Sequence, residues 1–219
     1  ASAPVLYDRL CGMIGVRYNN KHGRASSSEE GCFIWDEDEL IKERIKEIKQ
    51  QCKWCIVVSH AGDEFCDLPM PDVRERYLKY LEWGADIIVG HHPHVVQNYE
   101  YVGNKIIFYS IGNFLFGTDF ESIHSAANIG ILIKIDISED SYSWSYLPVL
   151  IEQKTGRVVT TVTPAIFKNI DGDTYSQFAP VAAKEYICQA EINNIKYNLK
   201  RRDISFLGRM RIVLSHIKK

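Results

Sequence analysis

The stretch that decides the fold is GADIIVGHHPHVVQ, residues 84–97. Its apolar part, residues 86–89, is short and bounded by glycines, which predicts a buried strand that runs into histidines. A second apolar run, residues 54–59, also ends at a histidine, His60. Between the two runs, residues 72–83 repeat apolar side chains at helical spacing. The order strand, helix, strand predicts a βαβ unit with both histidine groups at strand ends.

The sequence on either side extends this α/β pattern. Residues 36–51 are predicted to form a helix, because Leu40, Ile41, Ile45 and Ile48 form one apolar stripe behind an acidic first turn. Residues 12–18 are typical of a short strand. Beyond the histidines the pattern becomes rich in strands, which are predicted over residues 95–101, 105–110, 128–137, 143–151 and 157–162.

Composition excludes several classes of protein. The chain has 219 residues, of which 46% are hydrophobic and 25% charged, as in ordinary globular domains. The 26 basic and 28 acidic residues nearly balance, so the whole molecule is not a polyanion binder and no nucleic-acid partner is expected. No apolar run reaches the roughly 20 residues of a membrane helix, and no signal-peptide pattern is visible at the N-terminus.

The end of the chain differs in charge from the rest. Residues 196–219 hold eight Lys or Arg and one Asp, a local charge of +7, which leaves −9 for the remainder. Residues 178–217 return to a helical pattern, so residues 1–165 are predicted to form the main domain and residues 166–219 a helical, basic extension. Such a basic amphipathic helix can lie on an anionic membrane surface or dock on an acidic partner. The favoured alternative is that the helix packs its apolar stripe on its own domain.

The six cysteines show no regular spacing. Cys52 and Cys55 form a CxxC pair, which could be a redox pair or half of a zinc site. A zinc site would need a second pair nearby, and Cys55 opens an apolar run, so a buried structural role is favoured. Ungrouped cysteines in a chain of this length are typical of a reducing compartment.

Four histidines gather at the predicted strand ends. His60 ends one strand, and His91, His92 and His94 follow the other. Neighbouring parallel strands lie about 5 Å apart, so imidazoles from both can reach one ion. An extended backbone would place His92 and His94 on one face and His91 on the other, unless the chain turns sharply there. Imidazole is a frequent metal ligand and general acid or base; the alternative is a set of loop histidines with ordinary hydrogen bonds.

The loop after His60 adds two carboxylates to the same edge. Asp63 and Glu64 are candidates for metal ligands, for groups that orient the histidines, or for a general base. A solvated acidic loop is the alternative interpretation.

At these residues the sequence resembles a known family. The segments GADIIVGHHPHVVQ and IFYSIGNFLF (residues 107–116) are similar to the bacterial CapA family of capsule and poly-γ-glutamate synthesis proteins, which are related to calcineurin-like metallophosphoesterases. The segment HAGDE, residues 60–64, resembles the family's His-Trp-Gly-x-Glu segment, with Ala61 in place of Trp. The resemblance covers residues 12–117.

The resemblance implies an α/β/β/α sandwich with a divalent metal site, most often Mn²⁺ or Zn²⁺, at the strand ends. By this resemblance His60, His92 and His94 would be metal ligands, and His91 an alternative ligand or hydrogen-bonding partner. The implied chemistry is hydrolysis by a metal-activated hydroxide, with His91 and Glu64 as candidate catalytic residues. Asn113 is a candidate for the same edge or a simple turn residue.

The superfamily's earlier metal motifs (Asp-x-His, Gly-Asp and Gly-Asn-His) do not occur before His60. The chain is therefore expected to be the carboxyl-terminal part of a CapA-type protein, or a divergent member that holds one metal weakly or none. Whether it is an enzyme stays open, with a metal-dependent hydrolase favoured.

Three functions follow from this pattern. The first is capsule or poly-γ-glutamate biosynthesis with a hydrolase-like site, acting on an anionic polymer. The others are a non-catalytic scaffold among capsule-synthesis subunits and a general metallophosphoesterase acting on a small phosphoester. The location is undecided: the cysteines favour the cytoplasm, whereas the family is often membrane-associated.

Overall fold

The computed structural model describes residues 5–7, 11–17, 33–34, 37–114, 124–152, 155–176 and 192. They form two helices and nine strands in two sheets. The elements are β1 (Val5–Tyr7), β2 (Cys11–Arg17), α1 (Asp38–Gln51), β3 (Trp54–His60), α2 (Pro71–Trp83), β4 (Ile87–His91), β5 (Tyr99–Val102), β6 (Lys105–Phe108), β7 (Ile129–Ile137), β8 (Tyr142–Glu152) and β9 (Arg157–Thr160).

The larger sheet has the strand order β1-β2-β3-β4-β6-β5. Strands β2, β3, β4 and β6 run parallel, and β1 and β5 pair antiparallel at the two edges. The predicted βαβ unit is confirmed as β3, α2 and β4, with β3 and β4 in direct parallel pairing. One predicted strand is shorter than expected: over residues 95–101 only β5 is a strand, and Val96 makes just an isolated bridge to Ile111.

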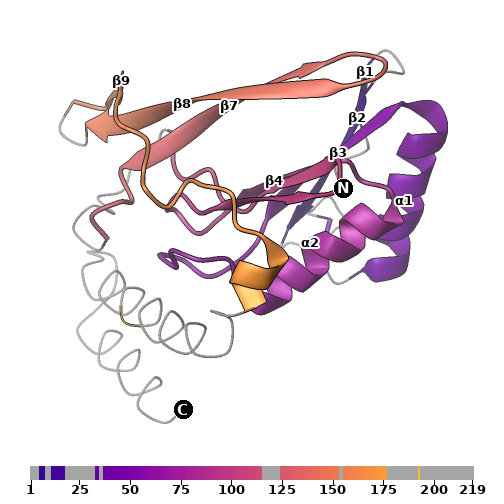
Figure 1. Ribbon diagram of the computed structural model, residues 1–219, viewed down its shortest axis with the longest axis horizontal. Coiled ribbons are helices and arrows are strands. Elements are labelled where there is room, and N and C mark those ends of the chain that lie inside the picture. Colours follow the sequence, from indigo (N-terminus) through magenta and orange to yellow (C-terminus); the bar gives the residue numbers. More distant parts are fainter. Residues whose placement is uncertain are drawn as a thin grey trace, which may run out of the picture.

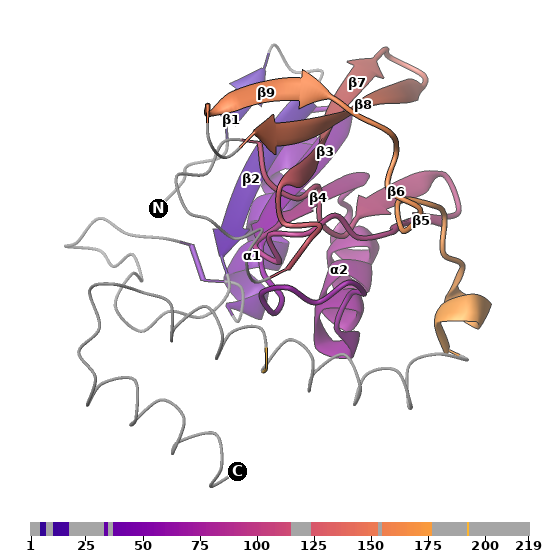
Figure 2. The ribbon, with the colours of Figure 1, turned by 90° about the vertical axis from the view of Figure 1, so that its left-hand side faces the viewer.

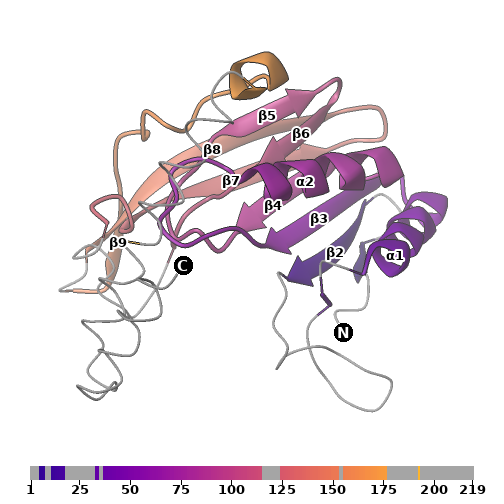
Figure 3. The same ribbon diagram turned by 90° about the horizontal axis from the view of Figure 1, so that it is seen from below.

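Helices α1 and α2 cover one face of this sheet (Figures 1 and 3). Helix α1 buries Ile41, Ile45 and Ile48 of the predicted apolar stripe, whereas Leu40, also predicted in the stripe, is exposed. Helix α2 begins at Pro71, a favourable residue at a first helical position, and ends at Gly84, whose φ of 122° suits glycine. Both helices pack on the apolar side chains of β3, β4 and β6.

The antiparallel sheet β7-β8-β9 covers the other face (Figures 1 and 2). Its inward side chains pack on the larger sheet in a second core that includes Trp54, Ile56, Ile87, Phe108 and Ile131. The described residues thus form three layers: helices, mixed sheet and antiparallel sheet. The α/β class is confirmed, and the second helical layer of an α/β/β/α sandwich remains a prediction.

The segment after β9 returns to the edge of the larger sheet. The Tyr99 N–H donates to the carbonyl of Lys168 (3.2 Å), and the Ile170 N–H donates to the carbonyl of Tyr99 (2.8 Å). A helical turn at residues 172–176 follows, and Tyr175 is buried against the helix-side core. The predicted basic helix, residues 196–219, lies outside the described residues, and the predicted domain boundary at residue 165 stays a prediction.

In the part of the chain that is described, no helix combines the length and apolar character needed to cross a membrane.

Candidate functional site

Strands β3 and β4 bring the two histidine groups side by side. Their parallel register pairs His60 directly with His91. The pairing continues one residue further, because the Ala61 N–H donates to the carbonyl of His91 at 3.0 Å. The sequence-based expectation that both groups lie at one carboxyl edge of the sheet is confirmed in this geometry.

Gly90, just before the histidines, allows the backbone to pass β6 closely. A Cβ added at Gly90 would lie 2.0 Å from the carbonyl oxygen of Tyr109, far inside contact distance. Only glycine fits there without displacing a strand. The packing at this point therefore fixes where the chain leaves β4.

Beyond β4 the chain turns sharply, and the predicted extended backbone is wrong. His92 has a φ of 105° and His94 a φ of 59°, both in a region that non-glycine residues rarely adopt. The loop after β3 stabilises this turn, since the Phe65 N–H donates to the carbonyl of Pro93 at 2.7 Å. Non-glycine residues in this conformation cost free energy and concentrate at functional sites, where surrounding contacts hold them in place.

The turn gathers three imidazoles. The His92 Nδ1 lies 3.1 Å from the Nε2 of His60, and their ring centroids are 4.8 Å apart. The rings of His92 and His94 have centroids 5.9 Å apart. The side chains predicted to bind a metal are therefore neighbours, although a turn rather than an extended strand brings them together.

Asn113 orients His94. Its Oδ1 accepts a hydrogen bond from His94 Nδ1 at 2.9 Å, and its Nδ2 donates to the carbonyls of Ala127 (2.8 Å) and His94 (3.2 Å). Because the carboxamide oxygen can only accept, Nδ1 of His94 carries the proton, and Nε2 of the neutral ring carries the lone pair. Metal-binding histidines are commonly oriented in this way, by a hydrogen bond from the ring nitrogen that does not bind the metal.

The donor set matches part of a metal site. Two nitrogens that share a tetrahedral ion at about 2.0–2.1 Å lie about 3.3 Å apart, close to the separation of His60 Nε2 and His92 Nδ1. Among the described residues, however, no three or more His, Cys, Asp or Glu side chains converge as a metal-binding group. The arrangement fits two ligands of one ion, and further donors would have to move in or come from outside these residues.

Two titratable groups flank the histidines. Burial lowers the pKa of His91, which favours its neutral form. Burial also raises the pKa of Glu64; nearby His94 opposes this effect, and Asp63 adds to it. Both candidate catalytic residues therefore lie in partly desolvated surroundings at the same edge, as acid–base groups at functional sites commonly do.

His124 lies close to this edge and was not identified from the sequence. Its Nε2 is 3.2 Å from Asp67 Oδ1, and its Nδ1 accepts the Ala126 N–H at 3.2 Å. Both ring nitrogens are thus engaged in holding the 124–128 segment, whose Ala127 carbonyl accepts from Asn113. A single histidine far along the chain gives no spacing pattern, so only the fold reveals its place.

The CxxC pair is buried. Cys52 and Cys55 are buried in the helix-side core, in agreement with the favoured structural role. Cys66 is also buried, and burial raises the pKa of its thiol to about 11, which keeps it protonated and unreactive near neutral pH.

Comparison with known proteins supports the resemblance found in the sequence. Residues 13–118 match the family described as bacterial capsule synthesis protein PGA_cap. The chain is 38% identical over 95 residues to the capsule biosynthesis protein CapA of Bacillus anthracis, a stretch that covers 42% of this chain and 23% of that protein. It is 35% identical over 96 residues to the PGA biosynthesis protein CapA of Bacillus subtilis, covering 44% of this chain and 25% of that protein.

A more distant match is the uncharacterized protein y4sH of Sinorhizobium fredii, 32% identical over 78 residues, which are 35% of this chain and 17% of that protein. The chain thus aligns with about a quarter of the length of the two CapA proteins. The matched family segment contains β3, α2, β4 and the histidine edge. The segment of this chain from residue 13 to residue 118 therefore belongs to the bacterial capsule synthesis protein family.

Proposed function

We propose that this chain contributes the histidine half of a divalent-metal hydrolytic site in a CapA-type protein of capsule or poly-γ-glutamate synthesis. The observation that carries the proposal is the 3.1 Å approach of His92 Nδ1 to His60 Nε2 at the carboxyl edge of a parallel sheet. Ligand and catalytic groups commonly gather at such edges.

The names of the relatives support a role in capsule or poly-γ-glutamate synthesis, and they say nothing about metal binding or hydrolysis. The two Bacillus relatives are named for capsule biosynthesis and PGA biosynthesis. Because the match covers about a quarter of each, the activity, the anionic-polymer substrate and any subunit partners of the whole protein are part of the proposal.

The proposed roles follow from the side chains. His60 and His92 would hold the ion through the facing nitrogens, and Asn113 would present His94 to it. A bound divalent ion would supply a polarised, more acidic water molecule. Burial favours the neutral form of His91, whose unprotonated ring nitrogen can accept a proton during the reaction.

Glu64 would act beside the ion rather than on it. Its raised pKa lets the carboxyl group hold a proton at higher pH than an exposed glutamate, so that it can donate to a leaving group. Phe65, which packs its ring 6.2 Å from that of His94, is buried and keeps water from that side.

Metal binding provides the direct test. We expect calorimetric titration with Zn²⁺ and Mn²⁺ to show one site in the unaltered chain, and at least tenfold weaker binding in His60→Ala/His92→Ala. His124→Gln is the matched control, because His124 lies near this edge but uses both nitrogens in structural contacts. Equal affinity in the unaltered chain and the double variant would rule out these ligands.

A second candidate, a non-catalytic scaffold, is favoured by one observation: the described residues hold no complete three-ligand group. Turnover assays separate the two functions. Metal-dependent hydrolysis of a phosphoester or of a γ-glutamyl amide that disappears in His60→Ala supports the hydrolase. A chain that binds metal but hydrolyses neither substrate supports the scaffold.

A further inference from the structure

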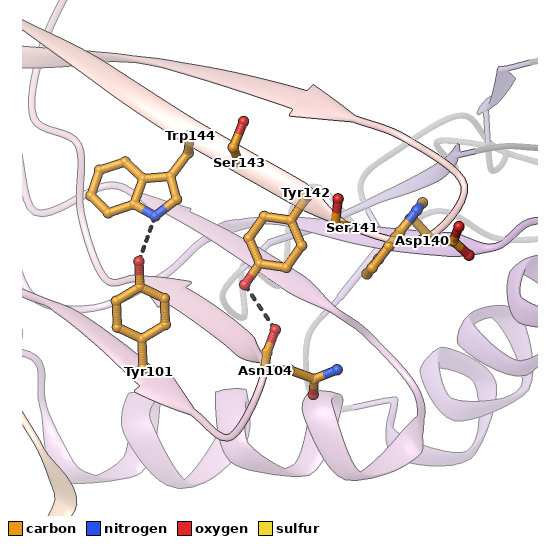
Figure 4. Close-up of a pocket in the computed structure, with 8 residues that line it drawn as sticks. Tyr101, Asn104, Asp140, Ser141, Tyr142, Ser143 and Trp144 are labelled. Atoms are coloured by element: carbon orange, nitrogen blue, oxygen red, sulfur yellow. Dashed lines mark hydrogen bonds between the residues drawn. The ribbon is translucent and has the colours of Figure 1, made fainter.

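A second candidate site lies at the other end of β3. A cleft of about 470 Å³ opens between the β5–β6 turn and the β7–β8 turn (Figure 4). Strand β3 reaches it with Trp54, its first residue, whereas His60 is its last. At about 3.3 Å per residue the cleft lies about 20 Å from the histidine edge, so the two sites are separate. Its lining residues are Trp54, Tyr101, Asn104, Asp140, Ser141, Tyr142, Ser143 and Trp144.

Hydrogen bonds fix the aromatic rings of this cleft. The Trp144 Nε1–H donates to the hydroxyl of Tyr101 at 2.7 Å, and the Tyr142 hydroxyl donates to the carbonyl of Asn104 at 2.9 Å. The Trp54 Nε1–H donates to the carbonyl of Ser138 at 2.7 Å. The first two bonds join the β5–β6 hairpin to β8, and the third joins β3 to the β7–β8 turn. The aromatic surface therefore exists before any ligand arrives, which lowers the entropic cost of binding.

The rings form a platform rather than an enclosed cage. In Figure 4 the rings of Tyr101, Tyr142 and Trp144 each present a face to the viewer. Trp54 meets Tyr142 edge to face, with ring centroids 5.5 Å apart and an interplanar angle of 81°. Tyr101 is 46% exposed, so the platform is open to a ligand. An open, flat aromatic surface suits a flat ligand that stacks on it.

Charge excludes several ligand classes. Of the described residues that line the cleft, only Asp140 is charged. Lys49 lies 5.9 Å from the centre of the Trp54 ring, but its ammonium donates to the Asp86 carboxylate at 2.8 Å and is already paired. Among the lining residues, a polyanion would meet a carboxylate and no unpaired cation. An organic cation would meet one solvent-screened carboxylate and no surrounding cage.

Polar groups at the rim complete the chemistry. The Tyr101 hydroxyl accepts from Trp144 and retains its own proton for donation. Burial, with Tyr101 and Asp86 nearby, raises the pKa of Tyr142 to about 12, so its hydroxyl stays neutral. The exposed carboxamide of Asn104 and carboxylate of Asp140 add donors and acceptors at one end.

We propose that this cleft binds a neutral carbohydrate, with a pyranose ring stacked on the Tyr101, Tyr142 and Trp144 platform. A pyranose has an apolar C–H face that packs on aromatic rings and hydroxyls around its rim that meet polar side chains. The volume is sufficient for one or two sugar units. The inference stands apart from the proposed function at the histidine edge.

The test is a titration of the chain with cellotetraose, chitotetraose and maltotetraose, followed by tryptophan fluorescence and by saturation-transfer NMR. We expect at least one of them to bind with a dissociation constant of about 1 mM or tighter. Tyr101→Ala should weaken that binding at least tenfold. Phe114→Ala is the matched control: it removes another exposed aromatic ring, one that does not line the cleft, and it should change affinity less than about twofold.

A second variant guards against a fold defect in Tyr101→Ala. Asn104→Trp places a large side chain in the cleft from an exposed turn position and keeps the backbone carbonyl that Tyr142 uses, so it should abolish binding with the rings intact. Binding that survives Asn104→Trp overturns the proposal, as does the absence of binding to all three oligosaccharides.

Choline chloride and poly-γ-glutamate distinguish the competing ligand classes. With a carbohydrate site, Asp140→Asn should change oligosaccharide affinity less than about threefold, and choline should not compete. Choline binding that is tighter than that of every oligosaccharide and is lost in Asp140→Asn would replace the carbohydrate by an organic cation. Competition by poly-γ-glutamate would overturn the charge argument.

Discussion

The two ends of β3 are built differently. At the carboxyl end, Gly90 lies so close to the Tyr109 backbone that no side chain fits there. The chain then turns through His92 and His94, whose backbones have positive φ. At the amino end, two hairpin turns meet through hydrogen bonds of exposed or half-buried aromatic side chains. The first end is constrained by backbone packing and the second by side chains, so substitutions at the two ends should differ in cost.

The largest difference in the free energy of unfolding is expected between substitutions of Gly90 and Gly103, one glycine near each end of β3. Gly90→Ala forces a Cβ into the Tyr109 carbonyl at 2.0 Å, so β4 or β6 must shift, and we expect a loss of about 3 to 5 kcal/mol in the free energy of unfolding. Gly103→Ala, in the β5–β6 turn, meets no atom within 4 Å and carries only the strain of a φ of 63°, about 1 kcal/mol. Urea unfolding measures both, and equal losses would contradict the comparison.

An intermediate difference in the free energy of unfolding is expected between substitutions of Asn113 and Asn104. Asn113→Ala removes the donor to two carbonyls and the acceptor for His94, and the buried Ala127 carbonyl loses a partner. We expect a loss of about 2 to 3 kcal/mol in the free energy of unfolding and, by NMR, changed chemical shifts of the His94 ring nitrogens, because Nδ1 loses its acceptor. Asn104→Ala is the matched control at the other end, where only the backbone carbonyl is used, and it should cost less than about 0.5 kcal/mol. An Asn113→Ala variant as stable as Asn104→Ala would show that Asn113 does not hold the turn.

The smallest effect is expected for Tyr101→Phe. The variant removes the hydroxyl that accepts from Trp144, but Tyr101 is 46% exposed and water can replace it. We expect a change below about 0.5 kcal/mol in the free energy of unfolding and a shift in Trp144 emission. A loss above about 1.5 kcal/mol would show that the amino end depends on this bond as strongly as the carboxyl end depends on its packing.

The βαβ core could be predicted from the sequence because its signals are local. The apolar stripe Ile41, Ile45 and Ile48 and the run of buried residues in β3 need only their own spacing to be read. Pro71 and Gly84 mark the two ends of α2 for the same reason. The parallel pairing then follows, because a helix of this length returns the chain to the neighbouring strand.

The site was predicted in part. Residues His60, His91, His92 and His94 were visible as a cluster, since two strand ends supply them. The left-handed turn at His92 and His94 could not be predicted from the sequence. It depends on the hydrogen bond from the Phe65 N–H to the Pro93 carbonyl and on the one between His94 and Asn113. The same holds for the His124–Asp67 pair and for the aromatic cleft, whose residues come from three separate strand ends.

The sequence by itself determined the α/β class, the parallel strand ends and the family of residues 13–118, because periodicity and motif are properties of neighbouring residues. Only the tertiary structure decided which ring nitrogens face one another and that Trp54, Tyr101 and Trp144 share one cleft. The physical reason is that such contacts join residues tens of positions apart. Their geometry is set by how the two sheets and the loops pack, and short-range pattern carries no record of it.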